Sequence, residues 1–158
     1  MRRWNGWGDE RTQVELPPVG RSFLAERIGE GRPLPDATLE AALARVPASR
    51  LPAHPLVSQS AVDRLRHARG QSLPDWLAMR SGDFGRFPDG VAYPLDTEQV
   101  AELLRYAADA DAIVIPYGGG TSVVGHINPP ATERPVLTVD MGRMNQLLDL
   151  DRESLIAT

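Results

Sequence analysis

The stretch AIVIPYGGGTS, at residues 112–122, joins a continuous apolar run to three consecutive glycines. The run Ala112–Pro116 predicts a β-strand that is buried on both faces. The glycines that follow have no side chain to block an incoming group, and they reach positive φ without a Cβ penalty. Successive N–H groups in such a loop form a nest suited to phosphate oxygens. The stretch therefore predicts either a phosphate-binding loop directly after a strand or a plain glycine-rich turn.

Three better-known loops do not fit this segment. A Walker loop needs a lysine, and all 17 basic residues of the chain are arginines. The dinucleotide fingerprint needs a glycine at its sixth position, where counting from Gly118 gives Val123. A nucleophile elbow needs Gly-x-Ser-x-Gly, and the residues around Ser122 do not follow that pattern.

The second half of the chain predicts strands and one long helix. Asp96 suits a helix N-cap with Gln99 reaching back, and an apolar stripe follows it at Val100, Leu103, Leu104 and Ala107. The order strand, helix, strand, loop, strand favours parallel pairing. We expect strands at 91–93, 112–116 and 136–140, a helical turn at 144–148, and a strand starting at 154–158 without its partner.

The first half predicts an irregular arm followed by short helices. Breakers interrupt residues 1–35, where Trp4 and Trp7 need burial as a packing anchor or, alternatively, as a ligand platform. We expect Asp36 to cap a helix with Leu39, Leu43 and Val46 on its buried face. Ser58 or Ser60 caps a second helix, with Val62 and Leu65 inward. A third helix runs over 74–80 and ends at Gly82. The second helix carries Arg64, Arg66, His67 and Arg69, which we interpret as a solvated outer face rather than a phosphate contact.

Composition excludes several classes of function. The 158 residues contain no cysteine, which removes disulfides, thiolate metal sites and cysteine nucleophiles. The absence of lysine removes Schiff-base chemistry, and a net charge of -4 argues against nucleic-acid partners. His54, His67 and His126 show no ligand spacing, so no metal site is expected, while a flavin or substrate contact by His126 stays open. No export signal or membrane-length apolar run is present, so we expect a cytoplasmic protein.

Several motifs resemble the FAD-binding domain of the vanillyl-alcohol-oxidase or p-cresol-methylhydroxylase (PCMH) type. They are Arg86-Phe87-Pro88-Asp89 before Val91-Ala92-Tyr93-Pro94, Pro116 to Val123, and Leu137-Thr138-Val139-Asp140 before Met144-Asn145. The arm Arg3-Trp4-Asn5-Gly6-Trp7-Gly8 resembles more narrowly the alkyldihydroxyacetonephosphate synthases and related FAD-linked oxidases. The resemblance implies an α+β fold. A helical lead-in over 1–82 would precede the first β-α-β subdomain of a PCMH-type domain over 83–158, incomplete at its C-terminus.

The resemblance also implies a cofactor site and a reaction. The FAD pyrophosphate would be wrapped by Pro116, Tyr117, Gly118, Gly119, Gly120, Thr121 and Ser122. Thr121 stands where some relatives carry the histidine that binds flavin covalently, so non-covalent FAD is expected. The implied activity exchanges the acyl chain of acyl-dihydroxyacetone phosphate for an alkyl chain. The alternatives are oxidation of a 2-hydroxy acid such as lactate or glycolate, and a non-catalytic domain.

Under this resemblance no residue of the chain is assigned to the chemical step. The family's catalytic positions would lie beyond Thr158, and the chain is expected to be a fragment. A small-molecule or lipid substrate is expected in the complete protein. Open sheet edges favour association, so a homodimer is also expected.

Overall fold

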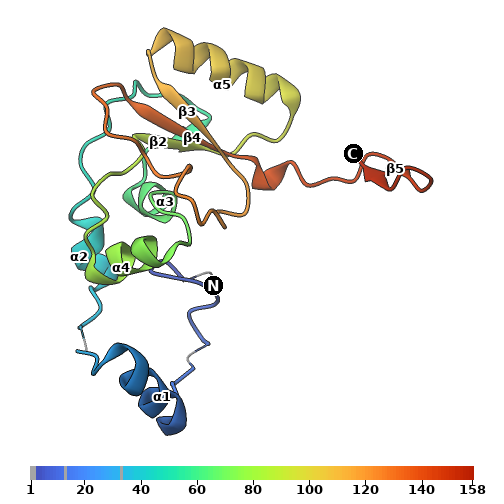
Figure 1. Cartoon of the computed structure of the whole chain (residues 1–158). Helices are drawn as coiled ribbons and strands as arrows, with labels where there is room; N and C mark the ends of the chain where they lie inside the picture. Colours follow the sequence, from blue (N-terminus) through green and yellow to red (C-terminus); the bar gives the residue numbers. More distant parts are fainter. Residues whose placement is uncertain (1–2, 13, 33) are drawn as a thin grey trace.

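The structure is a computed structural model that describes residues 3–12, 14–32 and 34–158. Its centre is a four-stranded sheet in the order β1-β2-β4-β3 (Figure 1). The strands are β1 (Val57–Ser58), β2 (Gly90–Ala92), β3 (Ile113–Tyr117) and β4 (Val136–Asp140). β4 pairs in parallel with both β2 and β3, whereas β1 pairs antiparallel with β2. The predicted α+β class and the parallel pairing are confirmed.

The expectation that the 112–116 strand is buried on both faces is wrong. β4, the last of these four strands in sequence, takes an inner position between β2 and β3, and its first four residues are buried. β3 lies at the sheet edge instead, with Ile113 and Val114 half-buried and Pro116 exposed. A proline is tolerated there because an edge strand has one side without ladder hydrogen bonds. The apolar run packs on both faces, because Val114 lies against the cluster under α5 while Ile115 belongs to a separate cluster with Ile127 and Val136, but the edge position leaves the strand only partly covered.

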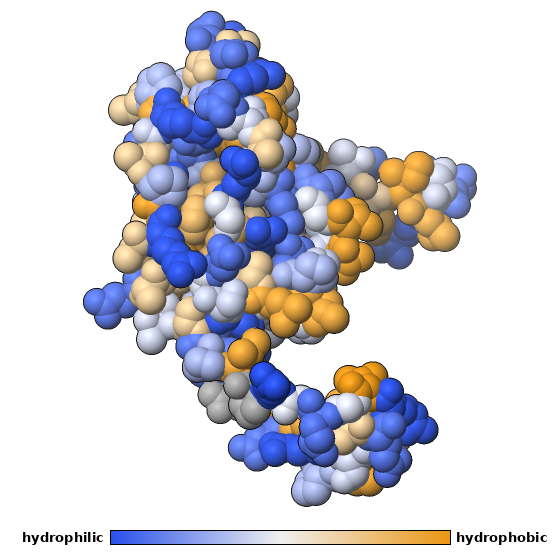
Figure 2. All heavy atoms as spheres, turned by 60° about the vertical axis from the view of Figure 1, so that its left-hand side comes forward, coloured by the Kyte–Doolittle hydropathy of each residue, from blue (hydrophilic) through white to orange (hydrophobic). Residues whose placement is uncertain are grey.

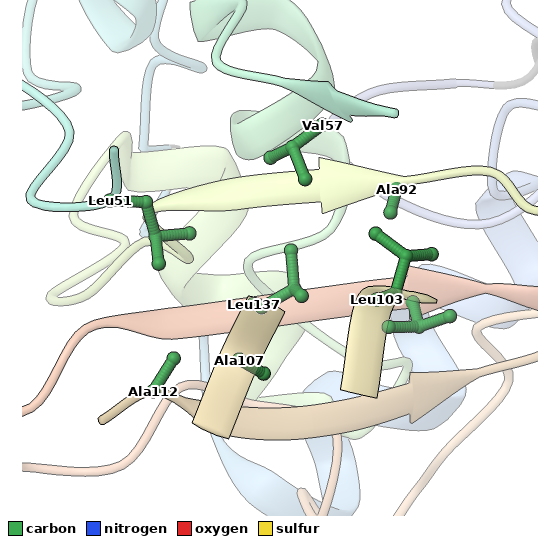
Figure 3. Close-up of a cluster of buried hydrophobic side chains, with 8 residues drawn as sticks. Leu51, Val57, Ala92, Leu103, Ala107, Ala112 and Leu137 are labelled. Carbon is green, nitrogen blue, oxygen red and sulfur yellow. The ribbon is translucent and has the colours of Figure 1, made fainter. Parts of the chain in front are cut away.

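Helix α5 (Thr97–Asp109) covers one face of the sheet. It begins as predicted, since Asp96 accepts a hydrogen bond from the Gln99 amide at 2.8 Å. Leu103 and Ala107 are buried and point toward the sheet (Figure 3). They pack into a cluster with Leu51, Val57, Ala92, Ala112, Leu137 and Val139. Burial of Leu103 contributes about 1.5–3 kcal/mol. Leu104, predicted on the same stripe, is 52% exposed.

Three short helices form the lead-in, and they pack around a second core. α2 (Leu39–Leu43) is capped by Thr38, not by Asp36, which bonds Arg80 instead. α3 (Ala61–Arg66) follows Ser60, and Val62 lies outward rather than inward. α4 (Leu73–Ser81) ends at Gly82 in the left-handed conformation, close to the prediction. The shared core consists of Ala42, Leu65, Ala68, Met79 and Phe84.

The N-terminal arm contains a helix that the breaker pattern concealed. α1 (Pro18–Ile28) starts with proline in its first turn, where a missing N–H costs nothing. None of its residues is buried, and it projects from the body with hydrophobic residues on its surface (Figure 2). Trp4 stacks on Phe84 at 6.3 Å between ring centroids, which confirms a packing anchor for this residue. Trp7 is 60% exposed, so the expected burial is wrong for this residue.

The C-terminal segment departs from the body as a hairpin (Figure 1). A 3-10 turn, η1 (Met141–Arg143), follows β4 directly, and the helical turn expected at 144–148 is wrong. The last strand does have a partner, because β6 (Ile156–Ala157) pairs antiparallel with β5 (Leu150–Asp151). All four residues of this pair are exposed.

Candidate functional site

The glycine loop begins at the carboxyl edge of the sheet, where β3 ends. Tyr117, the last residue of β3, is buried, and its ring lies 4.4 Å from that of His67. Tyr93 and Asp140 mark the same edge, because they lie at the ends of β2 and β4. Ligands of parallel sheets bind outside this edge, where a connection leaves the sheet. Of the seven predicted residues, Pro116 and Tyr117 are the last two of β3, and residues 118–122 follow them at this edge.

The three consecutive glycines have different roles. Only Gly120 has a positive φ, 68°, so only this position needs glycine for its backbone. A Cβ on Gly118 would meet nothing within 4 Å, and one on Gly119 would meet only Thr121 Cγ2 at 3.6 Å. The chain itself has no steric need for glycine at 118 and 119. The bare main chain there leaves room for a group from outside.

The backbone donors of the loop have no acceptor of their own. Within the part of the chain that the structure describes, the N–H groups of residues 118–122 donate no hydrogen bond. Gly118, Gly119 and Thr121 are exposed, so water satisfies their N–H groups, and an anion can take the place of that water. Donors without an internal acceptor, beside an open space, are the arrangement that a pyrophosphate requires. The residues present therefore fit this group.

The far end of the loop is fixed by residues that sequence reasoning missed. The Ser122 carbonyl accepts from the Gln71 amide at 2.6 Å. The Asn128 side chain donates to Asp75 at 2.7 Å and accepts from the Gly70 amide at 2.9 Å. These contacts join segments more than 50 residues apart in sequence. The sequence signal that could have pointed to Asp75 is its spacing of three residues from Ser72, which is typical of a capping box and not of a loop contact.

A small cavity of about 200 Å³ lies beside the loop at the same sheet edge. Its charged lining includes Arg3, Arg66, Arg69, Asp63 and Asp140. His67 separates the two acidic residues, with Nδ1 2.7 Å from the Asp63 carbonyl and Nε2 2.9 Å from Asp140 Oδ2. Because a carbonyl oxygen only accepts, Nδ1 is the donor in the first contact, and Nε2 faces the Asp140 carboxylate in the second. This pairing ties α3 to the end of β4.

The interpretation of the basic helix as a solvated face is wrong for two of its members. Arg64 is 3% exposed and donates to the carbonyls of Pro47 and Pro88, both at 2.7 Å. Burial lowers the pKa of its guanidinium. His67 is buried as well, while Arg66 is exposed.

Burial, together with the nearby Asp63, raises the pKa of Tyr93 well above its usual range, so its hydroxyl stays a donor to Asp63 at 3.1 Å.

The remaining histidines lie apart from one another. His54 lies 3.3 Å from Glu102, and His126 is exposed, with its Nδ1 3.4 Å from Ser122 Oγ. Among the described residues, no three histidine, aspartate or glutamate side chains come together as a metal site. In the same residues, no helix has the length and apolar character needed to cross a bilayer.

Comparison with known proteins assigns this region. Residues 88–158 match a family described as FAD binding domain. This part of the chain is similar to that family. The chain is similar over 96% of its length to the alkyldihydroxyacetonephosphate synthase of Trypanosoma brucei brucei, at 30% identity. A solved alkyldihydroxyacetonephosphate synthase structure covers 99% of the chain with a TM-score of 0.74 and 26% identity.

These matches confirm the resemblance to the synthase-like flavoproteins over nearly the whole chain. The chain spans only 30% of the trypanosome protein and 35% of the solved chain. A shorter similarity, 35% identity over 68 residues, links it to the mitochondrial D-lactate dehydrogenase [cytochrome] of Kluyveromyces lactis. That match covers 43% of this chain and 12% of the yeast protein. The division of the chain at residue 83 stays a prediction.

Proposed function

We propose that residues Pro116–Ser122 hold the pyrophosphate of a non-covalently bound FAD. The observation that carries this proposal is the set of unpaired N–H groups over 118–122, next to glycines that leave open space. Hydrogen bonds to a charged acceptor contribute about 1.5–3 kcal/mol each, so several of them would retain the cofactor. Thr121 has no nucleophilic nitrogen to offer the flavin, which supports a non-covalent attachment.

The proposal is tested by Gly119→Asp in the complete protein. The new Cβ meets only Thr121 Cγ2 at 3.6 Å, so the fold should tolerate it, whereas the carboxylate would repel the phosphates. We expect purification without flavin absorbance, and a melting temperature equal to that of the parent when both proteins are measured without FAD. Gly31→Asp is the matched control, because a Cβ at Gly31 is likewise unhindered, with nothing within 4 Å. A Gly119→Asp protein as yellow as its parent would reject the assignment.

We further propose that the complete protein uses this FAD in an alkyldihydroxyacetonephosphate synthase-type reaction. The similarity along 96% of the chain supports this reaction over others. The reaction replaces the acyl chain of an acyl-dihydroxyacetone phosphate by the alkyl group of a fatty alcohol, releases the fatty acid, and leaves no net redox change. The assay follows a radiolabelled fatty alcohol into the ether product, with no acceptor dye present.

The second candidate function is oxidation of a 2-hydroxy acid. The match to the yeast D-lactate dehydrogenase favours it, although that match covers less than half of the chain. Reduction of a dye by D-lactate or glycolate, without alkyl transfer, would select this function. A purified complete protein with neither activity and no bound flavin would select a non-catalytic role. The cytoplasmic location and the homodimer stay predictions.

A further inference from the structure

The glycine loop is docked on the turn that precedes α4. Gln71 donates its amide to the Ser122 carbonyl at 2.6 Å. Gly70 approaches that carbonyl so closely that any Cβ would overlap the Ser122 oxygen. The last residue of the proposed cofactor loop therefore touches the main chain of the helical lead-in, which lies outside the matched FAD binding domain residues.

The contact between the glycine loop and the Gly70–Gln71 turn is supported by one pair of side chains, Asp75 and Asn128. Asn128 donates through Nδ2 to Asp75 Oδ1 at 2.7 Å and accepts from the Gly70 amide through Oδ1 at 2.9 Å. These partners fix the orientation of the amide, because a backbone N–H only donates and a carboxylate accepts. Asn128 also donates its own amide to the Gly125 carbonyl at 3.0 Å, which closes the loop on itself.

Rotating the Asp75 carboxylate away from Asn128 would break its other hydrogen bonds. Its side chain is 3% exposed, and its other oxygen accepts from the Ser72 hydroxyl at 2.6 Å. Ser72 and Asp75 form the capping box of α4, which satisfies two helix N–H groups. Arg69 lies 3.5 Å from the first oxygen and balances its charge. The position of Asn128 is thus set by a rigid helix start.

We infer that Asp75 and Asn128 are positioning residues that hold the glycine loop in the shape that receives the FAD pyrophosphate. The inference rests on the proposed function, because it assigns the loop to that cofactor. Neither residue needs to touch FAD. The helical lead-in, through this Asp75–Asn128 pair, becomes part of the cofactor site.

An exchange of the two side chains tests the inference in the complete protein. Asn128→Asp places two carboxylates against each other and removes the donor, whereas Asp75→Asn with Asn128→Asp restores one donor and one carboxylate. The exchanged pair also keeps an acceptor for Ser72 and for the Gly70 amide. We expect Asn128→Asp to weaken FAD binding at least about tenfold, and the double variant to return to within about threefold of the parent.

A second measurement follows the junction without FAD. Hydrogen exchange at the Gln71 amide reports whether the Ser122 carbonyl stays in place. We expect faster exchange in Asn128→Asp and in the milder Asn128→Ala, with protection regained in the double variant. Thr38→Ala removes the cap of α2 and serves as the control for general destabilisation. It should change neither FAD affinity nor Gln71 exchange.

Each contrary result has one meaning. Unchanged Gln71 exchange in Asn128→Ala overturns the role of the pair, whatever FAD does. Faster Gln71 exchange with parental FAD affinity overturns the link between the pair and the cofactor. A double variant no better than Asn128→Asp overturns it as well. Loss of the proposed function is seen separately, as retention of FAD by Gly119→Asp.

Discussion

The amino and carboxyl ends of the parallel strands form two edges of the central sheet, and their polar groups differ in whether they have hydrogen-bond partners within the chain. At the amino edge, Asp89 precedes β2 and is 3% exposed, yet it accepts from the Val136 amide at 2.8 Å and from the Arg50 guanidinium at 2.7 Å. It also accepts from the Arg50 amide at 3.0 Å. At the carboxyl edge, the N–H groups over 118–122 have no acceptor among the described residues.

This contrast separates stability from binding. Buried polar groups that are matched within the chain hold the fold, and removing one partner costs the full desolvation of the other. The exposed loop donors bond water instead, so they add little to the stability of the fold and are available to a ligand. We therefore expect substitutions at the amino edge to change the free energy of unfolding, and substitutions in the glycine loop to change chiefly cofactor affinity.

The largest effect is expected for Asp89→Ala. It leaves the Val136 amide without its side-chain acceptor and Arg50 without its carboxylate, so the free energy of unfolding should fall by about 3–5 kcal/mol. Urea denaturation followed by circular dichroism measures the change. Asp83→Ala is the matched control, because Asp83 is 80% exposed and lies 4.0 Å from Arg45. Equal stability of the two variants would remove the contrast between the edges.

The same carboxylate predicts an acid-sensitive fold. Burial would raise the pKa of Asp89, but hydrogen bonds from Arg50 and from the Val136 amide outweigh it, and the pKa lies below its ordinary value. The ionised form therefore stabilises the fold above the unfolded pKa of about 3.9, and this contribution is lost as pH falls through the folded-state pKa. Unfolding midpoints measured between pH 7 and pH 2 should fall steeply below about pH 4. Asp89→Asn should flatten that part of the curve.

The stability cost of replacing a loop glycine should depend on whether the backbone at that position requires glycine. Gly120→Ala places a Cβ at a φ of 68°, which should cost about 1–2 kcal/mol of unfolding free energy. Gly119→Ala should change it by less than about 1 kcal/mol, in either direction. Thermal melting of both variants without FAD checks this difference. A large loss in Gly119→Ala would mean that the chain, and not a ligand, requires that glycine.

The smallest effect is expected for Thr138, which lies within β4 between the two edges. Thr138 is fully buried in β4, and its hydroxyl has no partner among the described residues. Thr138→Val keeps the shape and removes the unmatched group, so the free energy of unfolding should rise by about 1 kcal/mol. A chemical denaturation curve shifted to lower urea would show instead that the hydroxyl has a partner.

Helix capping and apolar periodicity in the sequence predicted the elements whose formation depends on residues close together in the chain. Asp96 and the stripe containing Leu103 and Ala107 predicted α5, because capping and period 3.6 act within a few residues. The edge position of β3 was not predicted, since it depends on β4 entering between β2 and β3. The Asp75–Asn128 pair was missed for the same reason, because no short motif records a contact across 53 residues.

The strand order also determines when the central sheet can form during synthesis of the chain. β4 is the last of the four strands to leave the ribosome, yet it fills the middle of the sheet. Until residues 136–140 are synthesised, β2 and β3 have no parallel neighbour, and assembly must wait for a non-local pairing, which is slow. The nascent chain therefore carries two open strand edges during translation, and a chaperone that shields them would raise the yield of folded protein.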